Sequence, residues 1–241
     1  MNLYKYASPV NFYPLAGKMI PWFAIPAAVL FAAGLFVGFF IAPTDFQQGD
    51  AYRIMFIHVP AAWMGMFLYV LMAAYAGIGW AFNARLSSMM ASSIAVTGAM
   101  FTFLSLITGA FWGKPTWGTW WVWDARMTST LILMFLYIGF ISLQASIDNP
   151  RRADRAGAVL ALVGVINVPI IYYSVQWWNT LHQGATIRIL GKPSIAPPML
   201  AAMLIMLGAC WLYSVAVVLI RLRCIILERE QNATRFVEAE A

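Results

Sequence analysis

Charged residues and metal-binding side chains are scarce in this sequence. Only 10% of its 241 residues are charged, and it has two cysteines and two histidines. Cys210 and Cys224 form no C-x-x-C pair, no zinc-ligand spacing and no C-x-x-C-H haem attachment site, so the chain is not itself a c-type cytochrome. A P-loop is also absent, because Gly109 to Lys114 has the wrong glycine spacing and Pro115 stands where Ser or Thr is needed.

Long apolar runs dominate what is present. The chain is 62% hydrophobic with a mean hydropathy of +0.76, more apolar surface than a soluble domain of this length can bury. The runs do not alternate as barrel strands would, and each is long enough to cross a bilayer as a helix. We therefore predict an all-α polytopic membrane protein, one domain over residues 1–241, with six spans near 21–42, 59–80, 91–112, 127–147, 156–176 and 198–222.

The basic residues predict the orientation of the spans. With the N-terminus inside, ten of the fifteen Lys and Arg residues fall in inner segments and five in outer ones, which favours both termini in the cytoplasm. Residues 1–20 carry no cleavable signal peptide and are expected along the inner interface. The net charge of +6 follows from this asymmetry and does not indicate nucleic-acid binding. No ionisable residue lies mid-span, which argues against a proton-coupled pump.

The two histidines are both expected at the outer boundary of the membrane. His58 lies in "MFIHVPAAW", where Pro60 suits the first turn of the second span, and His182 lies six residues beyond the fifth span. A single interfacial histidine is more often a structural hydrogen-bonding residue than a ligand. Two on one leaflet favour a shared ligand, and haem iron needs only one or two axial side chains whereas zinc needs three or four.

The stretch "WGTWWVWDAR" holds four tryptophans and an acid within residues 117–126. If residues 117–124 are helical, Trp117, Trp120, Trp121 and Asp124 share one stripe. One interpretation is an aromatic belt at the lipid headgroups. Another is a binding platform, in which Asp124 accepts an indole N–H or pairs with Arg126 or Arg53.

Three segments carry a resemblance to a known family. "WGKPTWGTWWVWDAR" is similar to the tryptophan-rich WWD motif of haem-handling membrane proteins. "YRIMFIHVPAAW" and "YYSVQWWNTLHQG" resemble the segments that carry its two axial histidines. The likeness covers nearly the whole chain; Met127 departs from the pattern, where leucine is expected. Larger family members with more spans and a second histidine pair do not fit this short chain.

This resemblance implies a haem-delivery subunit of the bacterial inner membrane that is not an enzyme. It implies that haem b is held non-covalently at the periplasmic face and presented to a membrane-anchored periplasmic haem chaperone for c-type cytochrome biogenesis. The implied partners are an ABC-type ATPase, its permease subunit and a small membrane subunit. The axial ligands would be His58 and His182, and the haem platform and chaperone docking surface would be Trp112, Trp117, Trp120, Trp121, Trp123 and Asp124 of segment 112–126.

Five basic residues depart from the inner-side bias. We expect them to neutralise the haem propionates, although solvated loop charges are the other interpretation. They are Arg53, Lys114, Arg126, Arg188 and Lys192.

Two other functions remain open at this point. A bis-histidine electron-transfer cytochrome would also use paired imidazoles, although two histidines on one leaflet permit only one such haem. A structural subunit would use the tryptophans only to dock a periplasmic protein.

Overall fold

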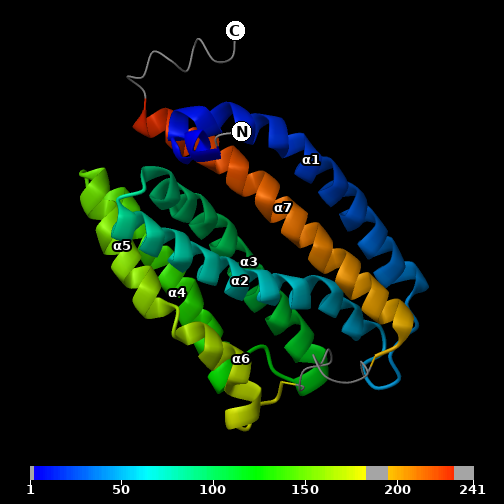
Figure 1. Ribbon diagram of the computed structural model, residues 1–241. Helices are drawn as coiled ribbons and strands as arrows, with labels where there is room; N and C mark the ends of the chain where they lie inside the picture. The colour runs from blue at the N-terminus through cyan, green and yellow to red at the C-terminus, as the bar shows by residue number, and fades with distance from the viewer. Residues whose placement is uncertain (1–2, 183–194, 231–241) are drawn as a thin grey trace.

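The computed structural model describes residues 3–182 and 195–230, and within them the fold is a bundle of helices without strands (Figure 1). Three short helical turns accompany the long helices: η1 (Leu3–Ala7), η2 (Val37–Ile41) and η3 (Asp50–Ile54). The longer helices are α1 (Pro9–Phe36), α2 (Met55–Phe82), α3 (Arg85–Trp117), α4 (Ala125–Ser146), α5 (Pro150–Gly164), α6 (Asn167–Trp177) and α7 (Pro197–Arg229).

The prediction of six spans is confirmed within the described ranges. Six helical segments there are long and apolar enough to cross a membrane, with α5 and α6 together forming the fifth. The first helix is longer than its predicted span: α1 begins at Pro9, whereas the span was predicted near residues 21–42. Proline suits the first turn because its missing N–H has no helical partner there, and the helix continues through three more prolines.

The fifth span is divided at Val165 and Ile166. Pro169 has no N–H, and its ring clashes with the carbonyl of Val165, the residue four positions earlier. Asn167, at the start of α6, donates from Nδ2 to the Ser129 carbonyl of α4 at 2.8 Å. Pro169 therefore breaks the fifth span, and Asn167 joins its second half to α4.

The helices form two packed groups joined through the central pair. α1 lies along α7, α2 lies along α3, and α4 packs against α3, α5 and α6 (Figure 1). Tyr137 of α4 is fully buried in the core and donates to the Gly65 carbonyl of α2 at 2.8 Å. This contact ties α4 to α2 and fixes the walls of the cavity described below.

The two ends of the bundle differ in composition. The start of α1, the end of α7 and the α4–α5 connection lie at one end (Figure 1). There Arg229 makes two hydrogen bonds to Asp154, at 2.9 and 3.1 Å, and joins α7 to α5. The opposite end holds connections 42–49 and 118–124 and the end of α6, so both histidines and the tryptophan-rich segment share it.

Candidate functional site

Both histidines line one cavity at the end of the bundle that carries the tryptophan-rich segment. Residues of α2, α3, α4 and α6 form its walls, and His182 enters from the connection after α6. Arg126 brings a positive charge to the lining, and the remaining wall is mostly apolar or small. The lining residues are His58, Ala62, Met66, Thr102, Ser105, Leu106, Gly109, Arg126, Met127, Thr130, Leu133, Ile171 and His182.

His58 is held by the backbone of the neighbouring helix. It lies in the first turns of α2, and its Nδ1 is 3.0 Å from the Ser105 carbonyl and 3.1 Å from the Thr108 hydroxyl of α3. The Thr108 hydroxyl donates to Leu104 O at 2.6 Å, so its oxygen is left to accept. Because a carbonyl only accepts, Nδ1 of His58 carries the proton.

His182 is held by a side chain. Its Nδ1 lies 3.2 Å from Oδ2 of Asp124, whose own side chain is only 6% exposed. A carboxylate accepts, so Nδ1 again is the donor. Burial, with a smaller effect from the charge of Arg126, lowers the pKa of His182 below its ordinary value, and the Asp124 carboxylate acts in the opposite direction. The net direction favours the neutral imidazole, the form that binds metals.

The two imidazoles thus have the same tautomer. In each ring Nδ1 donates to an oxygen, so Nε2 keeps a free lone pair. This is the arrangement in which proteins usually orient histidine ligands of metals. In the described part of the chain, no group of three or more His, Cys, Asp and Glu residues is placed to hold a bare metal ion. The two imidazoles fit a metal ion whose other coordination positions are already filled.

A tryptophan packs edge-on against each histidine. The rings of Trp112 and His58 have centroids 5.6 Å apart, and those of Trp117 and His182 are 4.9 Å apart. The Trp112 indole also donates to Oε1 of Gln48 at 2.8 Å, which ties the 42–49 connection to α3. The end of α3 therefore supports both imidazoles.

Residues 118–124 are not helical, and the predicted stripe of Trp117, Trp120, Trp121 and Asp124 was wrong. α3 ends at Trp117 because Gly118 takes a left-handed conformation, φ +77°, and returns its N–H to the Lys114 carbonyl. The chain then runs without helix until Asp124, whose Oδ1 accepts from Met127 N at 2.7 Å and caps α4.

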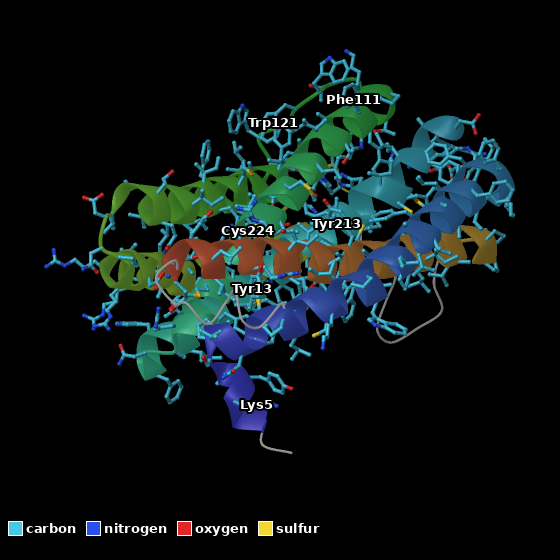
Figure 2. The ribbon with its side chains drawn as sticks, turned by 90° about the horizontal axis from the view of Figure 1, so that it is seen from above. Lys5, Tyr13, Phe111, Trp121, Tyr213 and Cys224 are labelled. Carbon is cyan, nitrogen blue, oxygen red and sulfur yellow. The ribbon has the colours of Figure 1, made fainter. Side chains whose placement is uncertain are left out.

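The non-helical segment 118–124 exposes part of its aromatic surface. Trp120 is 51% and Trp123 75% exposed, and Trp121 is partly covered. Trp121 packs against Trp123, and its buried indole N–H has no hydrogen-bond partner in the described residues. Figure 2 shows Trp121 and Phe111 on one side of the molecule, far from Lys5. None of these three tryptophans lines the cavity.

The predicted propionate-binding residues have different surroundings. Arg53 pairs with Asp50 at 2.9 Å and donates to the Gly38 and Ala42 carbonyls. Lys114 donates to the Gly118 carbonyl at 3.2 Å. Arg126 lines the cavity, and among the described residues its guanidinium has neither a hydrogen bond nor an ion pair at short range. Arg188 and Lys192 lie outside the described residues.

Asp124 was predicted as a site residue, but its contacts were not, and two other contributors to the site were missed. Asp124 was expected to pair with an arginine or an indole, whereas it caps α4 and holds His182. An Asp immediately before an apolar helical run is a signal for a helix N-cap and could have been recognised. The Ser105 carbonyl and Gln48 carry no such signal, because their partners lie far away in the chain.

The fold and the cavity define a polytopic membrane protein with a paired-imidazole site at one end of its helical bundle. A family model described as heme exporter protein C matches residues 2–237. This chain belongs to that family. Heme exporter protein C of Escherichia coli strain K12 is 46% identical over 231 residues, which cover 96% of this chain and 93% of that one. The protein of the same name from Bradyrhizobium diazoefficiens is 44% identical over 241 residues, with 99% and 90% covered.

A protein described as mitochondrial is also similar to this chain. A putative cytochrome c biosynthesis ccmC-like mitochondrial protein of Marchantia polymorpha is 46% identical over 162 residues, covering 67% of this chain and 68% of that one. These similarities confirm the resemblance noted in the sequence, which within the WWD family points to cytochrome c maturation protein C.

Proposed function

We propose that this protein binds haem b between His58 and His182 at the periplasmic face of the bacterial inner membrane and presents it to a periplasmic haem chaperone. One observation carries the proposal: both imidazoles line one cavity, and each has its Nδ1 held by an oxygen so that Nε2 is free. The porphyrin itself fills four positions of its iron, so two imidazoles complete the set. Haem is the cargo here and leaves with the chaperone.

The residues around the imidazoles bind and orient this cargo. Ser105 and Asp124 keep the two rings in the tautomer that offers Nε2, and Trp112 and Trp117 limit their rotation. Arg126 supplies a positive charge to a propionate, since its guanidinium is in the cavity and no carboxylate of residues 3–182 or 195–230 lies within hydrogen-bonding distance of it. The apolar wall excludes water from the iron.

The exposed tryptophans suit contact with a partner. Large, rigid aromatic side chains are enriched where protein interfaces bind most strongly, and Trp120 and Trp123 are exposed beside the site. The ATPase and permease of the maturation complex, and its small membrane subunit, would act on the complex after loading. We therefore expect no catalytic reaction in this chain.

The orientation is part of the proposal and has its own test. Reporter fusions at Asp45, Lys114 and Ser194 should read periplasmic, and fusions at Arg85, Arg152 and Glu230 cytoplasmic. A cytoplasmic signal at Lys114 would put the tryptophans in the wrong compartment and end the proposal.

The main experiment measures binding and delivery separately. The purified protein should show a six-coordinate low-spin haem spectrum and transfer haem to the purified chaperone. Trp123→Ala should keep the spectrum, change stability by no more than about 0.5 kcal/mol because the side chain is at the surface, and reduce transfer. Trp177→Ala is the matched control, since Trp177 is 57% exposed at the same end but lies outside the motif.

The result separates presentation from membrane anchoring. If both variants reduce transfer equally, the tryptophans act as an aromatic belt and not as a docking surface. A purified protein without bound haem would leave only the role of a structural docking subunit.

A further inference from the structure

Asp124 divides its two carboxylate oxygens between two tasks. Oδ1 accepts from Met127 N at 2.7 Å and caps α4, and Oδ2 accepts from Nδ1 of His182 at 3.2 Å. The residue is also the last one of the non-helical segment 118–124, which carries the exposed indoles. A single buried side chain therefore links a surface segment, a helix end and an imidazole.

The hydrogen bonds of His58 lead to α3 and not to segment 118–124. Its Nδ1 is hydrogen-bonded to a backbone carbonyl of α3, which cannot move unless that helix moves. α2 packs along α3, so His58 is held by two long helices. His182 follows α6 in a non-helical connection and depends on Asp124 for its orientation.

We propose that Asp124 is a positioning residue that couples the exposed surface of segment 118–124 to the release of His182 from haem iron. A partner that binds Trp120 and Trp123 and displaces the segment moves the carboxylate, and the His182 ring loses its orientation. The bond between iron and Nε2 of His182 then breaks, the electron pair stays on the imidazole, the proton stays on Nδ1, and no electron is transferred. His58 still holds the haem while the vacated side of the iron is offered to the partner. This inference rests on the proposed function, which makes His182 an axial ligand.

The first test compares variants of the haem-loaded protein. Asp124→Ser keeps an N-cap oxygen but leaves none for His182. It should lose part of the low-spin spectrum and speed haem transfer to a scavenging apoprotein by about tenfold, the lower end of the usual range for lost support of a metal ligand. Asp124→Asn keeps only one acceptor oxygen, so it can cap α4 but then turns its NH2 donor toward Nδ1–H of His182, and it should also lose part of the low-spin spectrum. Added imidazole should restore the low-spin spectrum of Asp124→Ser.

A double variant shows whether Asp124 acts through His182. If it does, Asp124→Ser should add nothing to His182→Gly, and the double variant should lose haem at the rate of His182→Gly alone. Fully additive effects would overturn the inference, because Asp124 would then act elsewhere. The matched control is Asn149→Ser, at the N-cap of α5 on the opposite end, where the side chain accepts from Arg151 N and Arg152 N. It should leave the spectrum unchanged.

The second test adds the haem-free chaperone. The absorption spectrum of the haem-loaded wild-type protein should shift toward that of His182→Gly when the chaperone binds. The spectrum of Asp124→Ser should shift little further when the chaperone is added. Movement toward the spectrum of His58→Ala would overturn the inference. The two failures remain distinct: an unchanged spectrum in His182→Gly refutes the ligand assignment, whereas a changed one with an unaffected Asp124→Ser refutes only the positioning role.

Discussion

The region around His58 and the region around His182 line the same cavity but are built differently. His58 lies in a long helix and bonds to the backbone of another, while His182 lies in a connection and bonds to one carboxylate. Helices packed along their length open together, whereas connections open locally at lower cost. A protein that must hold its cargo and then give it up benefits from one ligand of each kind.

The largest expected effect is a difference between the two histidine variants. His58→Ala should weaken haem binding by about a hundredfold, roughly 2.7 kcal/mol, and His182→Ala by only about tenfold. The rigid ligand loses less freedom on binding, so more of its bond energy appears as affinity. Haem titration of the purified apoproteins measures both. Equal losses, or a greater loss in His182→Ala, would remove the distinction between the two regions.

A smaller effect is expected when the ring of His58 alone is crowded. A Cβ on Gly109 of α3 would lie 3.0 Å from Cε1 of His58, so the ring must shift by a few tenths of an ångström. Gly109→Ala should weaken haem binding severalfold. Alanine also favours a helix over glycine by about 1 kcal/mol, so thermal stability should be equal or higher.

Gly208→Ala provides the control for that substitution. Its Cβ would meet only Leu30 Cδ1, at an ordinary 3.7 Å. It should change neither haem binding nor the spectrum. If Gly109→Ala lowered both stability and haem affinity, the packing of α3 would be disturbed, and the affinity alone would not report the position of the His58 ring. The absorption spectrum of the remaining bound haem would then show whether His58 still binds the iron.

The next expected effect is that of replacing Trp112, which contacts both His58 and the 42–49 connection. Trp112→Phe keeps an aromatic edge near the imidazole but removes the N–H that donates to Gln48. Stability should fall by about 1 kcal/mol, the usual value of one hydrogen bond. Gln48→Ala should add little to it in the double variant. Chemical denaturation in detergent measures this coupling, and simple additivity would show that the hydrogen bond contributes nothing.

Much of the fold was predictable because it depends on local sequence. The six spans follow from run length and composition, and the break in the fifth follows from Pro169. Both histidines lie at one end because four crossings, an even number, separate the start of the second span from the end of the fifth, with each crossing reversing direction. These features need no knowledge of which helix packs against which.

The details of the site were less predictable because they depend on tertiary contacts. Asp124 and His182 are 58 residues apart, and Trp112 and Gln48 are 64 apart. The helical stripe failed for a local reason: the left-handed Gly118 ends α3, and the capping preference of Asp124 starts α4, so the aromatic residues between them are not helical. Their helical spacing arose because tryptophan is so frequent in this short stretch.

The smallest effect should come from Thr108, and its size tests which oxygen orients His58. Nδ1 of His58 has two acceptors, the Ser105 carbonyl at 3.0 Å and the Thr108 hydroxyl at 3.1 Å. Thr108→Val keeps the shape and leaves the carbonyl, which belongs to the backbone of α3 and cannot be removed by a side-chain change. Haem affinity should therefore change by less than about twofold, roughly 0.4 kcal/mol, with the low-spin spectrum intact. A loss as large as that of Asp124→Ser would mean that His58, like His182, depends on one side chain, and the two regions would then hold their imidazoles in the same way.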